Sequence, residues 1–388
     1  MFGIFKRLGA AAAASLVLAG CAVIPDSGSA PMETAPPPVA SAPVPPSSPM
    51  LPMDEERHRI ALLVPLSGAN AEVGQAIANA TTMALLDTGS DTLRITTYDT
   101  SSGAGDAASQ ALADGNRLIL GPLMRDNVGA VLAVARPAQV PLITFSNDTT
   151  VARNDVFVLG HIPEQSVARS VDFAIDQGAR NFAVLAPRGD YGNRTLAAVE
   201  GAVEARGARL TRTERYDRNN TSILSAADRL TTAGGFDTVV IADSARMGME
   251  AAPRLKQSGD ALPSLIGTEL WSREADLARD ARMRGAWFSA VSDARYRQFA
   301  ESYQTRFGTS PYRIATLGYD AVLLTLRLTR EWEPGTRLPL SLLTDDEGFL
   351  GLDGAFRFRA DGIGQRAMEV RQVGNGTFTV VDPAATGF

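Results

Sequence analysis

The chain has 388 residues, more than one hydrophobic core usually serves, so two domains or lobes are expected. Its formal net charge of −6 argues against a nucleic-acid partner, because such surfaces need clustered positive charge. With one cysteine and two histidines, the composition excludes a disulfide framework, a cysteine-rich zinc site and a histidine-based metal cluster, so we expect neither a metal nor a cofactor.

The first 20 residues have the pattern of a bacterial lipoprotein signal peptide. Lys6 and Arg7 precede an apolar stretch, residues 8–19, that is too short to span a bilayer as a mature helix. The sequence Leu-Ala-Gly-Cys at 18–21 matches the lipobox, in which the cysteine is lipidated after cleavage. We therefore expect lipidation of Cys21, the alternative being a plain signal peptide with an unrelated cysteine.

Residues 21–54 are expected to be the lipidated cysteine followed by a Pro-rich tether. The segment is rich in Pro, Ala and Ser, cannot bury a core and favours extended polyproline II. Residues 31–54, at ~3.1 Å each, reach on the order of 70 Å. A spacer from the membrane towards peptidoglycan and a generic linker both fit. Ala22, instead of the aspartate of an inner-membrane retention signal, resembles the outer-membrane lipoproteins of Gram-negative bacteria.

Strands and helices alternate from residue 59 onward. The apolar run at 60–64 predicts a strand buried on both faces, and the following segment has apolar residues at helical spacing. The next predicted elements are, in order, a strand at 93–98, a helix at 106–114, a strand at 118–120, a helix around 128–135 and a strand at 141–144. This order predicts a parallel sheet with right-handed crossovers.

The pattern restarts after His161, which predicts a second α/β unit of similar size and therefore two lobes. Its predicted helices are 163–177, 191–205, 222–232 and 244–258, and its strands 182–186, 209–216, 238–242 and 265–266. After residue 286 come two predicted helices, 295–307 and 314–330, and three strands, 355–358, 367–373 and 378–381. Asn375-Gly376 is typical of a hairpin turn between the last two strands.

Polar residues follow the predicted strands, where open parallel sheets bind their ligands. The candidates in the first unit are Ser67, Arg125, Ser146 and Asp148, and those in the second are Tyr191, Asp243 and Glu269. Hydroxyls and helix N-termini of the first unit suit a carboxylate, and the acids of the second suit an amine. The set is typical of a clamp for an amino acid or a peptide. For each residue the alternative is an N-cap or turn role.

Several segments together resemble the type I periplasmic-binding fold of the leucine/isoleucine/valine-binding family, over roughly residues 59–383. Within it, the penicillin-binding protein activator lipoproteins resemble the chain more closely. The segments that carry this are 60–68, 98–102, 114–115 and, above all, Gly-Pro-Leu-Met-Arg-Asp-Asn-Val at 121–128. The resemblance implies two Rossmann-like lobes with parallel sheets and a cleft between them. Its lobes would be residues 55–160 with 294–344, and 161–293 with 345–388.

The resemblance to amino-acid binders carries over only in part. Tyr191 stands where that family stacks a tyrosine on the ligand, Glu269 where an acid meets the ligand amine, and Ser146 in the carboxylate-binding loop. Met124 and Arg125, however, stand where the binders usually place small hydroxyl residues, so Arg125 either pairs a carboxylate or fills the pocket. The long activators carry a helical-repeat domain before this fold, whereas only the tether is expected before it here.

The expected function follows from the activator resemblance. We expect an outer-membrane lipoprotein, on the periplasmic face, that regulates a bifunctional peptidoglycan synthase, a penicillin-binding protein. The alternative is a lipid-anchored solute-binding protein of an ABC transporter for amino acids or short peptides. An enzyme is not expected, because neither a Gly-x-Ser-x-Gly elbow nor a Walker loop is present.

Overall fold

The computed structural model describes residues 56–257, 262–272 and 274–388. The predicted signal peptide, the lipidation site Cys21 and the tether up to residue 54 lie outside the described residues. Within the described ranges, no helix combines the length and the apolar character needed to cross a membrane.

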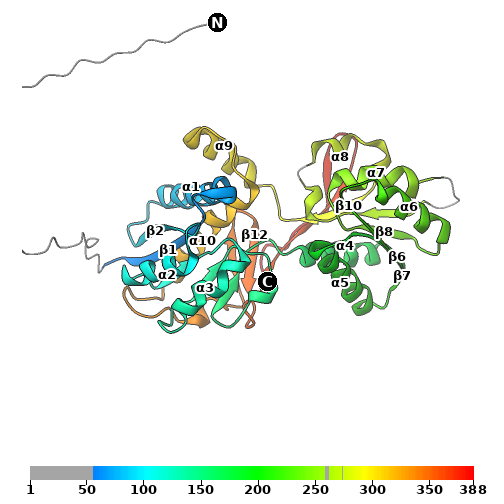
Figure 1. Cartoon of the computed structure of the whole chain (residues 1–388). Helices are drawn as coiled ribbons and strands as arrows, with labels where there is room; N and C mark the ends of the chain where they lie inside the picture. Colours follow the sequence, from blue (N-terminus) through cyan, green and yellow to red (C-terminus); the bar gives the residue numbers. More distant parts are fainter. Residues whose placement is uncertain (1–55, 258–261, 273) are drawn as a thin grey trace, which may run out of the picture. The chain divides into compact units, whose positions relative to one another are not determined.

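A five-stranded parallel sheet forms the first lobe, in the order β2-β1-β3-β4-β5. Its elements are β1 (His58–Val64), α1 (Ala71–Thr88), β2 (Leu93–Asp99), α2 (Ala104–Ala113), β3 (Leu118–Leu120), α3 (Arg125–Ala135), β4 (Leu142–Thr144), β5 (Val156–Val158), α9 (Tyr296–Phe307) and α10 (Thr316–Leu328). Successive residues of β1 are buried on opposite faces: Ile60 and Leu62 pack with α1 and α10, Ala61 and Leu63 with α2 and α3. Figure 1 shows this sheet between its two helix layers.

The second lobe contains a seven-stranded sheet in the order β15-β14-β10-β9-β8-β6-β7. Its elements are α4 (Pro163–Asp176), β6 (Asn181–Pro187), α5 (Asp190–Ala205), β7 (Arg209–Tyr216), α6 (Ser222–Ala233), β8 (Thr238–Ile241), α7 (Ala245–Leu255), β9 (Ser264–Ile266), α8 (Ala275–Arg279), β10 (Trp287–Ala290), β14 (Glu369–Val373) and β15 (Phe378–Asp382). Helices α4 and α5 cover one face, and α6, α7 and α8 cover the other. The predicted α/β class with two lobes is confirmed, although this sheet is mixed, because β14 and β15 run antiparallel.

The tail of the chain is divided between the lobes. A small antiparallel sheet is formed by β11 (Phe349–Gly351), β12 (Gly354–Phe358) and β13 (Gly364–Arg366). Phe349, Phe356 and Phe358 pack into the same core as β1 and α10. The expected boundary at residue 345 is therefore wrong for residues 349–366, whose phenylalanines are buried in the first lobe, and only β14 and β15 join the second sheet.

The expected elements mostly appear, with ends that differ by one to three residues. The helix expected at 244–258 ends at Leu255, and the predicted hairpin joins β14 to β15, with Gly376 at a φ of +81°. Four short strands were not expected: β5, β10, β11 and β13. Short 3-10 helices also occur at Gly68–Asn70, Thr149–Val151, Glu269–Trp271, Ala281–Met283, Arg313–Ala315 and Leu340–Leu342.

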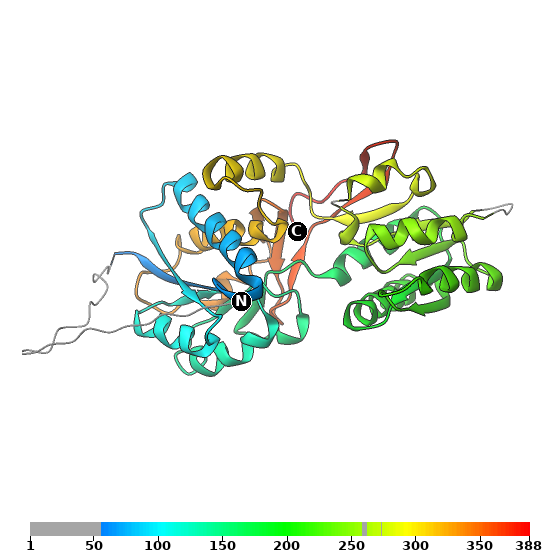
Figure 2. The same ribbon diagram turned by 45° about the horizontal axis from the view of Figure 1, so that its top comes forward.

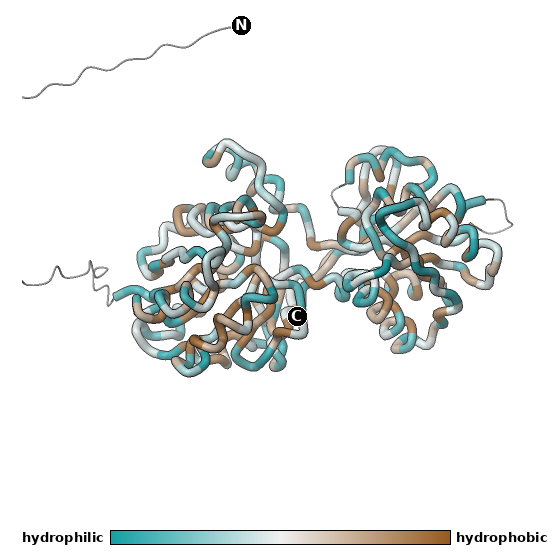
Figure 3. Tube along the Cα trace, in the orientation of Figure 1, coloured by the Kyte–Doolittle hydropathy of each residue, from teal (hydrophilic) through white to brown (hydrophobic). Residues whose placement is uncertain are grey.

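Both lobes bring a helix start close to the end of a strand by the same means. A Cβ atom at Gly74 of α1 would lie 1.8 Å from the backbone oxygen of Pro65, and one at Gly192 of α5 would lie 1.9 Å from that of Pro187. Only glycine permits so close an approach. Figure 2 shows α1 and α5 in their lobes, and Figure 3 shows hydrophobic segments inside each lobe beneath more hydrophilic outer segments.

Candidate functional site

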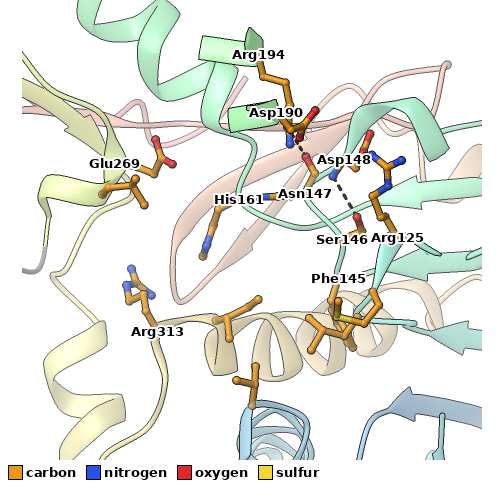
Figure 4. Close-up of a pocket in the computed structure, with 15 residues that line it drawn as sticks. Arg125, Phe145, Ser146, Asn147, Asp148, His161, Asp190, Arg194, Glu269 and Arg313 are labelled. Atoms are coloured by element: carbon orange, nitrogen blue, oxygen red, sulfur yellow. Dashed lines mark hydrogen bonds and ion pairs between the residues drawn. The ribbon is translucent and has the colours of Figure 1, made fainter. Parts of the chain in front are cut away.

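A pocket of about 550 Å³ lies at the carboxyl ends of the strands and receives residues from both lobes. The first lobe contributes the loops after β3 and β4, at residues 123–125 and 145–148, together with Arg313 and Ile314 before α10. The second lobe contributes Asp190 and Arg194 of α5 and the loop after β9 at 269–270. Val73 of α1 and His161, in the crossing segment before α4, complete the lining. Figure 4 shows Arg125, Ser146 and Asp148 on the opposite side of the pocket from Glu269 and Arg313.

Four of the seven predicted cleft residues line this pocket, namely Arg125, Ser146, Asp148 and Glu269. Ser67 does not line it: its Oγ donates to Asp99 at 3.3 Å in the loops after β1 and β2. Asp243 does not line it either. It is buried at the end of β8, where its Oδ2 accepts hydrogen bonds from Tyr216 at 2.7 Å and Arg218 at 2.8 Å.

Tyr191, the remaining candidate, supports the pocket from behind. Its hydroxyl lies 3.0 Å from Oε1 of Glu269 and 2.9 Å from Oγ1 of Thr268. Burial, together with the charge of Glu269, raises the pKa of Tyr191, so the hydroxyl stays protonated and donates. Tyr191 does not line the pocket, so it is not placed to stack on a ligand as the resemblance implied. Its hydroxyl instead orients Glu269.

Glu269 carries an unusual carboxylate. Its Oε2 is buried and has no hydrogen-bond partner among the described residues. Burial raises the pKa of Glu269 to about 7, and the hydrogen bond from Tyr191 opposes this only in part. A buried oxygen without a partner costs about 1–3 kcal/mol, so this atom favours a ligand that donates to it.

Arg125 and Asp148 form the opposite wall. Nη1 of Arg125 lies 2.5 Å from Oδ2 of Asp148, while Asp148 Oδ1 accepts from the backbone nitrogen of Thr150 at 2.8 Å. Burial alone would raise the pKa of Asp148, but the bonds from Thr150 and the charge of Arg125 outweigh it, and the pKa lies below its ordinary value. The wall therefore holds an ionised carboxylate that already neutralises its arginine. Ser146 supports the loop by accepting from the backbone nitrogen of Asp148 at 3.1 Å.

Arg194 joins the two lobes beside the pocket. Glu164 of α4 binds its guanidinium through two contacts, at 2.6 and 2.8 Å. Its Nη2 also donates to the backbone oxygen of Asn147 in the first lobe at 2.8 Å. A bidentate pair of this kind fixes the orientation of an arginine. Glu164 therefore holds Nη2 of Arg194 in position to bind Asn147 at the edge of the pocket.

Buried ion pairs tie together the segments that cross between the two sheets. Asp353, fully buried, accepts from His161 Nε2 at 2.7 Å and Thr316 Oγ1 at 2.8 Å and forms an ion pair with Arg313. Arg366 binds the backbone oxygen of Leu159 at 3.0 Å. Although burial would raise the pKa of Asp353, the charge of Arg313 and the bond from His161 hold it well below its ordinary value.

A third crossing segment is held in the same way. Arg371 of β14 binds Asp293 at 2.6 Å and the backbone oxygen of Val291 at 3.0 Å, and both of these residues follow β10. The crossing segments, which form the hinge of the molecule, are therefore held by paired charges. Breaking these pairs costs more than breaking exposed ones, because Asp353 and Arg371 are buried.

Across the described ranges, no group of three or more His, Cys, Asp or Glu side chains is arranged to hold a metal ion.

Sequence reasoning missed several pocket residues. Asp190 and Arg194 lie in the first turns of a helix that follows a strand, a position that does point to the pocket. Arg313 gave no comparable signal, because it is far along the chain. Asn147 lies between Ser146 and Asp148 in the loop that was expected to carry the site, and it takes part through its backbone. His161, after which the second predicted unit begins, lies in a crossing segment and binds Asp353.

Two α/β lobes connected by several crossing segments, with a pocket at the carboxyl ends of their sheets, define a two-lobed binding protein. The model of the family described as "Periplasmic binding protein" matches residues 58–377, and the chain belongs to this family. Among solved structures, a branched-chain amino acid ABC transporter periplasmic ligand-binding protein from Burkholderia xenovorans superposes with a TM-score of 0.66 at 15% identity, over 86% of this chain and 95% of that one. Full-length LpoA from Haemophilus influenzae superposes with a TM-score of 0.66 at 21% identity, over 84% of this chain and 59% of that one.

The sequence relatives include activators and one protein without an assigned role. The penicillin-binding protein activator LpoA of Glaesserella parasuis is 28% identical over 141 residues, which is 36% of this chain and 24% of that protein. An uncharacterized protein of Rickettsia prowazekii is 27% identical over 175 residues, 45% of this chain and 47% of that protein. The chain thus spans less than half the length of these relatives. The type I periplasmic-binding fold and the resemblance to the activators are confirmed.

Proposed function

We propose that this protein is a cell-envelope lipoprotein that activates a penicillin-binding protein, a bifunctional peptidoglycan synthase, by binding it and without catalysing a reaction. The similarity to activators supports this: a second one, from Mannheimia succiniciproducens, is 30% identical over 145 residues. The binding free energy would stabilise the active conformation of the synthase. The fold alone is equally compatible with an activator and a solute receptor, so the pocket has to distinguish them.

The ion pair between Arg125 and Asp148 is the observation that carries the proposal. A receptor for amino acids must offer free donors to the ligand carboxylate. Here the arginine on that wall is already bound at 2.5 Å by a carboxylate of the protein. A ligand carboxylate would have to displace Asp148 or lie beside it, and like charges in one site repel. This wall therefore favours a protein whose activity does not depend on amino-acid capture.

Anchoring by a lipid on Cys21 belongs to the same proposal. The Pro-rich tether of residues 21–54 would let the folded part reach a synthase from the periplasmic face of the outer membrane. Labelled palmitate incorporation into the native chain, lost in Cys21→Ala, tests the anchor. Separation of inner and outer membranes by density tests its location.

Affinity capture tests the partner. The tagged full-length protein is recovered from crosslinked, detergent-solubilised envelopes, and the co-purifying proteins are identified. Recovery of a bifunctional penicillin-binding protein, followed by faster glycan polymerisation when the two purified proteins are mixed, is the expected result. A permease with its ATPase and no synthase would overturn the activator proposal.

A second candidate function is solute binding, which the unpartnered Oε2 of Glu269 favours. The pocket of about 550 Å³ falls within the ~300–1,000 Å³ range of small-molecule sites. If solute binding is the function, the protein purified from its own envelope releases one stoichiometric small molecule on denaturation, and Glu269→Gln abolishes its retention. No retained molecule and no effect of the substitution would exclude this candidate.

A further inference from the structure

We propose that the pocket selects a small apolar primary amine that has no carboxylate, in preference to a zwitterionic amino acid. This rests on the second candidate function, that the pocket holds a ligand, and adds the chemical class of that ligand. Three features of the pocket support this proposal: acids that form no ion pair, arginines that each pair with an acid of the protein, and apolar walls.

Among the described residues, two acids on the second-lobe side of the pocket, Asp190 and Glu269, form no ion pair. Oε2 of Glu269 has no partner among the described residues, and Tyr191 holds the other oxygen at 3.0 Å, which fixes the carboxylate. Asp190 lines the same pocket next to Arg194, whose guanidinium is already bound to Glu164. A primary ammonium supplies three donors and one positive charge, which is the complement of this side.

Each arginine that lines the pocket is bound by an acid of the protein. Arg125 is bound by Asp148 at 2.5 Å and by Asp126 at 3.2 Å, and Arg194 is bound by Glu164 at 2.6 Å. Arg313 forms an ion pair with buried Asp353. Burial lowers the pKa of His161, the remaining basic side chain, so it is neutral at pH 7. A ligand carboxylate would thus lose its hydration without gaining an unpaired cation in return.

The rest of the lining suits a hydrocarbon. Leu123, Phe145 and Ile314 line the first-lobe side, and Met124 and Leu270, 38% and 40% exposed, lie at the pocket from opposite lobes. Apolar ligand atoms covered by these side chains gain about 25 cal/mol for each Å² removed from water. An amine with a branched aliphatic or aromatic body satisfies the acids and the apolar walls together.

Matched probes separate the amine from the amino acid. Isothermal titration at pH 7.5 uses the full-length chain in detergent, with a detergent blank, and compares 3-methylbutylamine with leucine, and 2-phenylethylamine with phenylalanine. Each amine is its amino acid without the carboxylate. We expect at least one amine to bind at least tenfold more tightly than its amino acid. We expect 4-methylpentanoate, which is leucine without the amine, not to bind.

Variants test the cause of the preference. Glu269→Gln removes the unmatched charge and should weaken amine binding at least tenfold. Asp148→Asn keeps an acceptor for Thr150 but releases Nη1 of Arg125, whose Nε stays paired with the exposed Asp126. It should reduce the ratio of amine affinity to amino-acid affinity at least fivefold. Asp155→Asn removes the acid that pairs with Arg136, a first-lobe ion pair that does not line this pocket. It is the matched control and should leave this ratio unchanged.

Each contrary result has a distinct meaning. Tighter binding of an amino acid than of its amine would overturn this proposal while supporting solute binding. Binding of none of the probes would overturn the proposal, and the retained-molecule experiment would then decide separately whether the pocket holds any ligand. An unchanged affinity ratio in Asp148→Asn would contradict the role assigned to the matched arginines. The affinity-capture experiment, which tests the activator proposal, is independent of these binding measurements.

Discussion

Nη2 of Arg194 in α5 donates a hydrogen bond to the backbone oxygen of Asn147, 2.8 Å away in the loop after β4. The contact joins the second lobe to the first beside the pocket rather than through the crossing segments. Because Glu164 fixes the same guanidinium through two bonds, the contact restrains the separation of the lobes as well as the position of one side chain.

Replacing Arg194 by glutamine should shift the protein towards a more open arrangement. Loss of a partly exposed charge-assisted hydrogen bond corresponds to roughly 1 kcal/mol, or about a fivefold change in the open population. Small-angle X-ray scattering should report a larger radius of gyration. Arg206→Gln is the control, because Arg206 follows the same helix but pairs only with Asp172 and Asp176 in α4. Identical scattering from both variants would show that Arg194 does not restrain the lobes.

Asp353→Asn should destabilise the protein strongly. The substitution removes the buried charge that pairs with Arg313 and accepts from His161. It leaves Arg313, which is largely buried, with the more exposed Asp293 at 3.7 Å as its remaining acid, and should cost about 3–5 kcal/mol. Urea unfolding should show this loss in the free energy of unfolding. Glu331→Gln removes an exposed acid that pairs with Arg327 and should change the free energy by less than about 0.5 kcal/mol. Equal effects would mean that the hinge charges are solvated.

The pKa of Glu269, raised to about 7 from an ordinary 4.5, makes stability depend on pH. Between these values the folded protein holds a proton that the unfolded chain has lost, so the free energy of unfolding falls as the pH rises through this window. Asp320, whose pKa burial also raises to about 7, acts with the same sign. Relative to Glu269→Gln, the native chain should lose on the order of 1–3 kcal/mol from pH 5 to pH 8. Parallel stability curves for the two proteins would contradict this assignment.

Two glycines of α5 should respond oppositely to alanine. A Cβ at Gly192 would lie 1.9 Å from the backbone oxygen of Pro187, so Gly192→Ala must displace the helix start and should cost about 2 kcal/mol or more. Gly201 has open space around its Cβ position, and Gly201→Ala should stabilise the helix by about 0.5–1 kcal/mol. Thermal unfolding of the two variants distinguishes them. A tolerated Gly192→Ala would mean that α5 is not held against β6.

Much of the fold could be predicted because its strands are buried on both faces. Continuous apolar runs such as residues 60–64 have few alternatives to a central parallel strand, and the intervening helices show regular spacing. The missed strands are three or four residues long. Runs this short do not show a period, so local pattern does not mark them. Strand β10 also pairs with β14, about 80 residues further along the chain, whereas β11 and β13 form hairpins with β12.

The sequence by itself determined the α/β class, two lobes, the loops that carry the pocket and the presence there of Arg125, Ser146, Asp148 and Glu269. These follow from local periodicity and from the rule that ligands meet parallel sheets at the carboxyl ends of the strands. Only the tertiary structure decided that Asp148 neutralises Arg125, that Tyr191 stands behind Glu269 and that residues 349–366 pack in the first lobe. Such pairings depend on distances between segments far apart in the chain, and those distances are set by packing of the whole molecule rather than by any local pattern.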